Sequence, residues 1–292
     1  MVVTTGFFDG VHLGHRQVIS ELVGAARERG TLACVLTFWP HPRTVLQDGA
    51  RDLRLLNTLD EKREMLLGLG VDRVEVIPFT REFSHLTTEE YLRDVVIGRY
   101  GGTALLVGFD NRMGHDAGGA GDIAAAAAAA GLEVLRTGPV ASGGAPVSST
   151  RIRAALAAGR VEEAAAMLGY DYRLHGVVVS GDRKGRTMGF PTANLQLYEP
   201  LKLLPGDGVY EVDVETTGRR LRGMCNIGVR PTVSAGNHRT IETHILDFDE
   251  EIYGLDLRLS FRRKIRDERK FSSLDELRAQ LERDKKEVII GK

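Results

Sequence analysis

Two histidines three residues apart, His12 and His15, end the segment Gly6-Phe-Phe-Asp-Gly-Val-His-Leu-Gly-His15, which follows a short apolar run. A helix that begins here would direct unpaired N–H groups and the positive end of its dipole toward one point, where a phosphate can bind. Gly14 leaves room for phosphates, and both imidazoles can donate hydrogen bonds to the same position. Attack at an α-phosphorus loads charge onto its oxygens, which fixed donors stabilise. The segment therefore indicates a nucleotidyl-transfer site, with a chance pair of surface histidines as the alternative.

A second candidate for phosphate binding follows the last apolar run of this half, in Val147-Ser-Ser-Thr-Arg-Ile-Arg153. Ser148 or Ser149 suits the N-cap of a helix, where a hydroxyl satisfies a free backbone N–H group. Three hydroxyls and Arg153 at one helix start also suit a triphosphate, because a guanidinium group matches the geometry of phosphate oxygens. The segment Thr37-Phe-Trp-Pro-His-Pro42 adds aromatic rings and a histidine after another apolar run, with an ordinary strand terminator as the alternative.

The second half of the chain contains a glycine-rich loop that lacks the Walker A pattern. Its glycines are Gly181, Gly185 and Gly189. Such a loop can bring its backbone close to phosphates. Thr192 and Asn194 follow, and in an extended segment side chains two residues apart lie on one face. Their oxygens suit Mg²⁺, which keeps other positions for water and substrate phosphates. The loop therefore indicates a Mg-ATP site, with a glycine-rich hairpin as the alternative.

Glu242 is the candidate general base of the second half, in Thr240-Ile-Glu-Thr-His-Ile-Leu-Asp-Phe248. This segment predicts a strand, on which Glu242 and His244 share a face. A glutamate with a reference pKa of about 4.3 is ionised at neutral pH, and it can orient a substrate hydroxyl and accept its proton late in phosphoryl transfer. The alternative is an ordinary acidic residue on the outer face of a strand, and only the context decides between the two.

The elements that would position these residues change along the chain. In the first half, short apolar runs alternate with helix-forming stretches. The runs lie at 2–4, 32–38, 74–77, 104–107 and 132–135, and the first helix is expected at about 14–29. This alternation predicts a parallel sheet with helices on both faces, whose ligand crevice lies at the carboxyl ends of the strands.

After about residue 172 the periodicity becomes that of half-buried antiparallel strands. Apolar and polar residues alternate over 210–215 and 255–262, with Gly and Pro between these stretches, which predicts a small barrel. The segment Ser273-Leu-Asp-Glu276 has the form of a capping box and predicts a C-terminal helix with Leu274 on its apolar stripe.

The length of 292 residues fits two domains, which we place at 1–165 and 172–292. Lys and Arg number 39 and Asp and Glu 40, so no global charge favours nucleic acid or an anionic membrane as a partner. Cys34 and Cys225 are too few for a disulfide framework or a zinc site, which favours a cytoplasmic location. We expect neither a signal peptide nor a membrane span. Small molecules are the expected partners, and the sequence leaves the oligomeric state open.

The first half resembles the adenylyltransferase half of the bacterial bifunctional riboflavin kinase/FAD synthetase (FMN adenylyltransferase) family, through its H-x-G-H, S-S-T-x-x-R, F-D-G and T-F-x-P-H-P motifs. The resemblance implies an α/β nucleotidylyltransferase fold with a Rossmann-like parallel sheet. It implies that His12 and His15 contact the reacting phosphates, and that Asp110 lies in a crevice that binds the flavin. The ATP-binding residues that it implies are Gly6, Phe7, Asp9, Gly14, Ser149, Thr150 and Arg153.

The second half resembles the riboflavin kinase half of the same family over nearly its whole length. The shared pieces are G-x-x-x-G-R-x-x-G-F-P-T-A-N, P-G-D-G-V-Y at 205–210, N-I-G-V-R-P-T at 226–232, E-T-H-I-L-D-F and R-x-E-x-K-F. The resemblance implies a six-stranded Greek-key β-barrel with a C-terminal helix, in which Thr192 and Asn194 bind Mg-ATP and Glu242 is the base. It also implies that Gly181, Gly185 and Gly189 contact ATP and that Asn226 and Arg269 contact the flavin.

Together the two halves imply an enzyme that phosphorylates riboflavin to FMN with ATP and Mg²⁺ and then adenylylates FMN to FAD, releasing pyrophosphate. One stretch departs from the family pattern, since Asn111 and Met113 stand where aromatic residues are common. One alternative is therefore a riboflavin kinase with a weakened adenylyltransferase half. Another is a flavin or nucleotide sensor, although a sensor has no need of the base and both histidines together. The H-x-G-H signature also occurs in class I tRNA synthetases, but this chain lacks a basic face for RNA.

Overall fold

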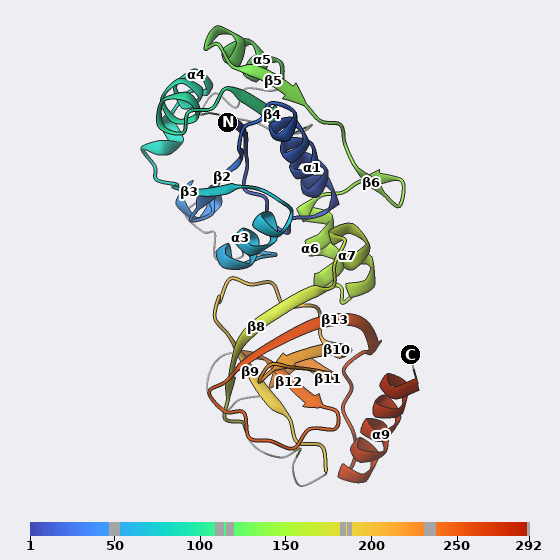
Figure 1. Ribbon diagram of the computed structural model, residues 1–292. Helices are drawn as coiled ribbons and strands as arrows, with labels where there is room; N and C mark the ends of the chain where they lie inside the picture. Colours follow the sequence, from blue (N-terminus) through green and yellow to red (C-terminus); the bar gives the residue numbers. More distant parts are fainter. Residues whose placement is uncertain are drawn as a thin grey trace. The chain divides into compact units, whose positions relative to one another are not determined.

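The structure is a computed structural model that describes residues 1–46, 53–108, 114, 120–181, 185, 189–230 and 238–290. Asp110, Asn111 and Met113 lie outside the described residues. The chain forms two compact units, Met1–Ser149 and Thr150–Lys292, each with its own buried core (Figure 1). The division of the chain into functional domains at 1–165 and 172–292 stays a prediction.

The first unit is built on a five-stranded parallel sheet with the strand order β3-β2-β1-β4-β5. Its strands are β1 (Val2–Thr5), β2 (Ala33–Trp39), β3 (Arg73–Pro78), β4 (Ala104–Val107) and β5 (Glu133–Arg136). The chain adds β2 and β3 on one side of β1 and then β4 and β5 on the other. The order therefore reverses next to β1, and in sheets of this kind ligands bind beyond the carboxyl ends of the strands at that point.

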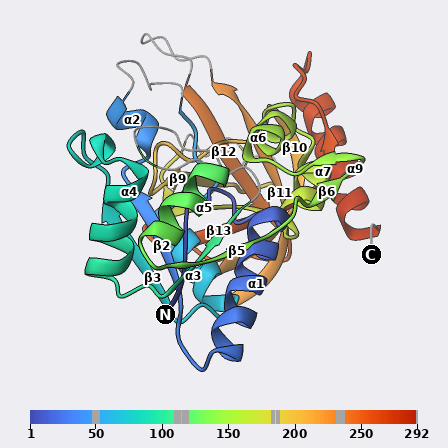
Figure 2. The same cartoon turned by 90° about the horizontal axis from the view of Figure 1, so that it is seen from above.

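Helices cover both faces of this sheet. The longer ones are α1 (Leu13–Glu28), α3 (Leu59–Gly68), α4 (Thr88–Glu90) continuing into the π-helix η3 (Tyr91–Arg99), and α5 (Ala120–Ala129). Val2 packs with the apolar faces of α1 and α3, whereas Val3 packs with those of η3 and α5. Figures 1 and 2 accordingly show α1 and α4 on opposite sides of the sheet. Burying each large apolar side chain contributes about 1.5–3 kcal/mol.

Short elements complete the first unit. They are α2 (Pro42–Leu46), η2 (Phe83–His85) and the hairpin of β6 (Ala141–Ser142) and β7 (Ala145–Pro146).

The second unit is a closed antiparallel barrel with the strand order β10-β11-β12-β9-β8-β13. Its strands are β8 (Tyr172–Val179), β9 (Ala193–Leu197), β10 (Gly208–Thr216), β11 (Arg219–Arg230), β12 (His238–Ile245) and β13 (Asp256–Arg266). The barrel closes because β13 pairs with both β10 and β8. Tyr210, Val212 and Val214 are fully buried along β10, so the alternation seen in the sequence reports the inside of the barrel. The parallel sheet, the barrel and the C-terminal helix confirm the predicted fold class.

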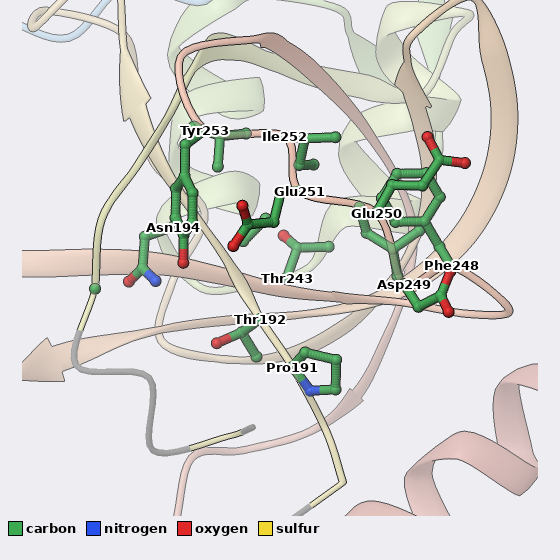
Figure 3. A pocket seen from close by; sticks show the side chains of 14 residues that line it. Pro191, Thr192, Asn194, Thr243, Phe248, Asp249, Glu250, Glu251, Ile252 and Tyr253 are labelled. Atoms are coloured by element: carbon green, nitrogen blue, oxygen red, sulfur yellow. The ribbon is translucent and has the colours of Figure 1, made fainter. Parts of the chain in front are cut away.

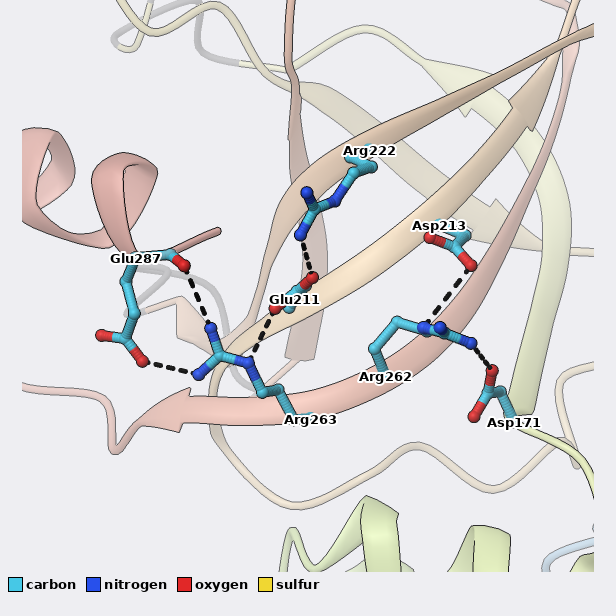
Figure 4. A network of polar contacts seen from close by, with 7 residues as sticks. All are labelled: Asp171, Glu211, Asp213, Arg222, Arg262, Arg263 and Glu287. Carbon is cyan, nitrogen blue, oxygen red and sulfur yellow. Dashed lines mark hydrogen bonds and ion pairs between the residues drawn. The ribbon is translucent and has the colours of Figure 1, made fainter. Parts of the chain in front are cut away.

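Helices α6 (Ser149–Ala157), α7 (Val161–Leu168) and α9 (Leu274–Ile290) accompany the barrel. The C-terminal helix α9 lies outside the barrel against β11 (Figures 1 and 2). Ion pairs fasten it there: Arg263 of β13 bridges the buried Glu211 of β10 and Glu287 of α9 (Figure 4), and Arg266 pairs with the buried Asp284.

The two cysteines are buried and free. Burial raises the pKa of Cys34 to about 11 and that of Cys225 to about 12, so both remain thiols at neutral pH. Among the described residues, no helix combines the length and the apolar character needed to cross a membrane.

Candidate active sites

The turn that follows β1 has an unusual backbone. Phe8, Gly10 and Val11 have φ angles of 53°, 88° and 35°, and a positive φ is rare for a β-branched residue such as valine. Backbone strain of this kind persists only where the surroundings fix it, and it is concentrated at functional sites. This turn leads directly into α1, at the predicted phosphate site.

The Asp9 side chain anchors the turn from within. It is 5% exposed, and its carboxylate accepts hydrogen bonds from the backbone N–H groups of Leu56, at 3.0 and 3.1 Å, and Asn57, at 3.1 Å. The Ser149 hydroxyl donates to the Asp9 carbonyl at 2.9 Å. The bonds to the carboxylate fasten the turn to the loop before α3, and the bond from Ser149 fastens it to the first residue of α6. The predicted contact of Asp9 with ATP stays a prediction.

Two basic side chains, one on α3 and one on α1, donate hydrogen bonds to the backbone of the turn. Lys62 Nζ of α3 donates to the Phe7 carbonyl at 2.8 Å and to the Thr37 hydroxyl at 3.1 Å. Arg16 Nε of α1 donates to the Val11 carbonyl at 3.2 Å. Both ends of the strained turn are thereby fixed to neighbouring elements.

The two predicted histidines lie together at the N-terminus of α1. His12 is the N-cap, and its Nδ1 accepts a hydrogen bond from the His15 backbone N–H at 3.3 Å. The neutral His12 ring therefore carries its proton on Nε2. The two rings stack with their centroids 3.6 Å apart and an interplanar angle of 16°. A Cβ atom at Gly14 would lie 3.2 Å from Cε1 of His12, so glycine there preserves the stacked arrangement.

His15 has a neutral ring with a buried nitrogen atom that could bind a ligand. Burial, together with the nearby His12 and Lys62, lowers the pKa of His15 well below its usual value, so its ring is neutral at pH 7. Its Nδ1 atom is buried, and within the described part of the chain it has no hydrogen-bond partner. Because buried polar atoms are almost always paired, an orphan at a helix N-terminus suits a bound phosphate.

An aromatic cavity of about 540 Å³ adjoins the same turn. Gly6 and Phe7 belong both to the turn and to the cavity wall. The other wall carries the rings of Phe38, Phe79, Phe83 and Tyr91, which contact one another. A cavity of this size with ring faces suits a flat aromatic ligand. No single sequence motif marks this cavity, because its rings come from separate segments of the chain.

Two further residues predicted to bind ATP lie on α6. Thr150 is exposed and Arg153 is half-buried, and both belong to the second compact unit. Their contact with ATP stays a prediction.

On the barrel, Thr192 and Asn194 line one cavity together with Gly181 (Figure 3). A Cβ atom at Gly181 would lie 2.2 Å from Nδ2 of Asn194, so only glycine lets the backbone approach this amide so closely. The acidic segment 249–251 also lines the cavity. Two neutral oxygen ligands beside carboxylates, with open space for phosphates, fit a Mg²⁺ ion.

Glu242 lies at the centre of a row of polar side chains on the outer face of the barrel. It is the direct partner of Asn194 on β9 and of Asn226 on β11. Cross-strand partners point to the same side of a sheet with Cβ atoms about 5 Å apart. All three residues are half-buried. The register thus brings the predicted base beside one predicted metal ligand and one predicted flavin ligand.

The predicted Arg269 lies elsewhere on this unit. It is exposed, it donates a hydrogen bond to Gln280 of α9 at 2.6 Å, and its guanidinium lies over the Phe271 ring. It does not line the cavity of Thr192 and Asn194, and its predicted contact with the flavin stays a prediction.

Two other predicted glycines flank the segment that carries the metal ligands. A Cβ atom at Gly185 would lie 2.2 Å from the Phe190 carbonyl oxygen, and Gly189 has a φ of 80°. The fold therefore requires both glycines for backbone reasons, and their predicted contact with ATP stays a prediction.

His244 supports the metal-ligand segment in a way that sequence reasoning missed. It lies two residues after Glu242 on β12, and its Nδ1 donates to the Pro191 carbonyl, next to Thr192, at 2.9 Å. Its ring also meets the Phe190 ring edge to face. Burial lowers its pKa, while the Pro191 carbonyl opposes this effect. The sequence shows only that His244 alternates with Glu242, which predicts the face on which it lies but not its hydrogen-bond partner.

Two family profiles match separate parts of the chain. The FAD synthetase family profile matches residues 1–151, and the riboflavin kinase family profile matches residues 168–289. The chain is 37% identical to the bifunctional riboflavin kinase/FMN adenylyltransferase of Listeria monocytogenes, over 98% of this chain and 91% of the relative. It is 39% identical to the Escherichia coli protein of the same name, over 97% and 90%.

A solved structure is also similar over the full length. It is a crystal structure from Streptococcus pneumoniae described as a macrolide-efflux protein, with 34% identity and a TM-score of 0.92, and the match covers 99% of this chain and 93% of that one. Both family profiles and the two relatives show where the chain belongs. It is a member of the bifunctional riboflavin kinase/FMN adenylyltransferase family.

Proposed function

We propose that the two reactions of this family take place at the two sites described above. On the barrel, the ribityl 5′-hydroxyl of riboflavin attacks the γ-phosphorus of ATP, and Glu242 accepts the hydroxyl proton. At the N-terminus of α1, a phosphate oxygen of FMN attacks the α-phosphorus of a second ATP. The bond from that phosphorus to the bridging oxygen breaks, and pyrophosphate leaves as FAD forms.

The observation that carries the barrel assignment is the row of Asn194, Glu242 and Asn226 across three adjacent strands. It places a carboxylate between a cavity wall that suits Mg-ATP and an amide that can orient a flavin. Because phosphoryl transfer has a loose transition state, catalysis here depends on positioning and on charge stabilisation more than on a strong base. A carboxylate beside both substrates supplies that positioning.

The assignment of adenylyl transfer rests on the stacked histidines. Both rings lie at a helix N-terminus, and His15 presents a buried nitrogen that needs a partner. Ring N–H groups and backbone N–H groups at this point can stabilise charge that develops on the α-phosphate oxygens. The aromatic cavity beside Gly6 and Phe7 would take the isoalloxazine ring of FMN.

We also propose Mg²⁺ as the cation of the kinase site. Thr192 and Asn194 would hold it, and when bound it would neutralise charge on the ATP phosphates. Two other residues position these ligands. Gly181 leaves space for the Asn194 amide, and His244 donates a hydrogen bond to the Pro191 carbonyl, next to Thr192. A cytoplasmic location, and small molecules as partners without nucleic acid or a membrane, are further proposals, which come from the sequence.

One assay tests this assignment: purified protein is incubated with riboflavin and Mg-ATP, and the flavins are separated by chromatography over time. We expect FMN to appear first and FAD to follow. FMN without FAD would support a kinase with an inactive adenylyltransferase half. Unchanged riboflavin that stays bound to the protein would support a sensor. Omitting Mg²⁺ should stop FMN formation.

A further inference from the structure

Lys62 is a buried charge that neither reaction obviously requires. It lies near the start of α3 and is 2% exposed. Its ammonium group donates to the Phe7 carbonyl and to the Thr37 hydroxyl, and it lies 3.9 Å from the centroid of the Phe7 ring. Burying an ammonium group costs free energy even when it is hydrogen-bonded. Its presence therefore needs a reason.

The groups around Lys62 do not depend on it for their hydrogen bonds. The Phe7 carbonyl also accepts a hydrogen bond from the Thr37 hydroxyl, at 3.3 Å. The Asp9 carboxylate is held by two backbone N–H groups of the loop before α3. Satisfying its neighbours therefore does not explain the buried charge.

The position of Lys62 next to the proposed phosphate site does explain its buried charge. Its positive charge contributes to the low pKa of His15, and the Asp9 carboxylate in turn favours the charged form of Lys62. The charge therefore acts at the N-terminus of α1, while the hydrogen bond to Phe7 holds the start of the strained turn. No substrate contact is needed for either effect.

We propose that Lys62 is a positioning residue for adenylyl transfer, which fixes the turn at residues 7–11 and adds positive charge beneath the phosphate-binding end of α1. The inference rests on the proposed adenylyl-transfer site. Lys62 acts through Phe7 and through the electrostatic potential at His15. Fixed positive charge of this kind stabilises the negative charge that develops on the α-phosphate in the transition state.

The variant Lys62→Met removes the charge and keeps an unbranched apolar side chain. We expect kcat for the conversion of FMN to FAD to fall roughly tenfold or more. Riboflavin phosphorylation by the same chain serves as the internal control for folding and should not change. The thermal midpoint should stay the same or rise, because a buried charge is lost. Arg63→Met removes an exposed positive charge at the next position of α3 and should affect neither reaction.

The pH profile distinguishes this role from a structural one. Burial lowers the pKa of Lys62 to about 8, and Asp9 opposes that shift. The titratable groups that interact with Lys62 are Asp9 in the turn and His15 on α1. His15 is already neutral at pH 8, because its pKa lies well below 6.5. FAD formation by the native chain should therefore fall as pH rises through about 8, where the lysine loses its proton.

Variants at this position should alter that step in the profile. Lys62→Met should lack it. Lys62→Arg keeps its charge over this range, so it should retain more activity than the methionine variant and also lack the step. FAD formation by Lys62→Met within twofold of the native rate, or with the step unchanged, would overturn the inference. Loss of both activities with a lower thermal midpoint would do so as well, because Lys62 would then be a structural residue. A native chain that forms no FAD would contradict the proposed function and this inference with it.

Discussion

Glu242 lies between two amide side chains, because Asn194 and Asn226 occupy the opposing positions on the neighbouring strands. A glutamate on the outer face of a barrel strand is ordinary by itself. What changes its chemistry is that one neighbour lines the cavity proposed for Mg-ATP. A carboxylate at that place can hold the hydroxyl of riboflavin next to the γ-phosphate and take its proton as the new bond forms.

Replacing this carboxylate by its isosteric amide should abolish the first reaction. In Glu242→Gln, we expect FMN formation to fall by about 10²–10⁴-fold, since the amide cannot accept the proton. Conversion of added FMN to FAD should continue at nearly the native rate. Glu215→Gln removes a carboxylate from β10, which β11 separates from β12, and it should leave both reactions unchanged. Native rates of FMN formation by Glu242→Gln would show that another group acts as the base.

The Gly181 position tests the proposed metal ligand without removing it. In Gly181→Ala the new Cβ atom would lie 2.2 Å from Nδ2 of Asn194, so the amide must move. A shift of about 1 Å in a catalytic group can cost 10²-fold in rate. We expect riboflavin phosphorylation to fall and half-saturation to need more Mg²⁺, measured by titration of Mg²⁺ at fixed ATP.

The matched control for this change is Gly24→Ala in α1. Nothing lies within 4 Å of a Cβ atom there, and alanine stabilises a helix interior by about 0.5–1 kcal/mol relative to glycine. Both reactions should be unaffected by it. An unchanged Mg²⁺ dependence in Gly181→Ala would argue against Asn194 as a ligand of the ion.

Sequence reasoning finds residues that belong to dense motifs and misses those that act through contacts. His12, His15, Thr192, Asn194 and Glu242 stand in segments whose spacing suggests chemistry. Lys62 lies outside such segments, and for His244 the segment indicates only that it shares a face with Glu242. Their importance appears only with their partners, the Phe7 carbonyl and the Pro191 carbonyl, which are distant in sequence. The tertiary fold creates these pairs.

At the scale of elements, α9 depends on buried ionic contacts as well as on apolar ones. Asp284 is 1% exposed and accepts hydrogen bonds from Arg266, at 2.9 Å, and Gln280, at 2.6 Å. Val288 packs in the cluster with Val209 and Met224 of the barrel wall. The helix thereby covers the outer face of the barrel at Val209 and Met224.

Removing the Asp284 carboxylate should loosen this helix. Breaking a buried ion pair leaves the remaining charge without its partner, and we expect Asp284→Ala to cost about 2–4 kcal/mol. Hydrogen exchange of the backbone amides at 274–290 should accelerate more than that of β10. Glu282→Ala, at an exposed position of the same helix, should leave the exchange unchanged. Equal protection of α9 in both variants would mean that apolar packing alone holds it.

The elements themselves were largely readable from the sequence. Helices and strands produce different spacings of buried apolar residues, which can be recognised in the sequence. The helix expected at 14–29 agrees with α1, and the strand expected at 104–107 agrees with β4. The C-terminal helix was placed correctly, but Leu274 is 70% exposed and so lies off the apolar stripe. The Glu276 carboxylate bonds to Ser272 and not to the backbone of Ser273. The hydrogen-bond partners of a helix cap and the edge of an apolar face depend on tertiary packing, which the spacing of residue types does not reveal.

At the scale of the molecule, the groups proposed to react lie in different compact units for the two reactions, although Thr150 and Arg153, predicted to bind ATP for adenylyl transfer, belong to the second unit. The histidine pair and the aromatic cavity lie in Met1–Ser149, whereas Glu242 and the metal-ligand segment lie in Thr150–Lys292. Nothing in either set requires FMN to pass directly between them. Release of FMN and its rebinding is therefore the simplest description of the two-step reaction.

A mixture of two variants, each defective at one site, tests this description. Glu242→Gln alone should form no FAD from riboflavin, and the double variant His12→Ala/His15→Ala should stop at FMN. Mixed in equal amounts with riboflavin and Mg-ATP, the two chains should form FAD after a lag during which free FMN accumulates, as followed by chromatography. The lag should shorten as the concentration of Glu242→Gln is raised, because that chain must capture FMN from solution. A mixture in which FMN stays bound to the double variant and no FAD forms, although Glu242→Gln converts added FMN, would contradict release and rebinding.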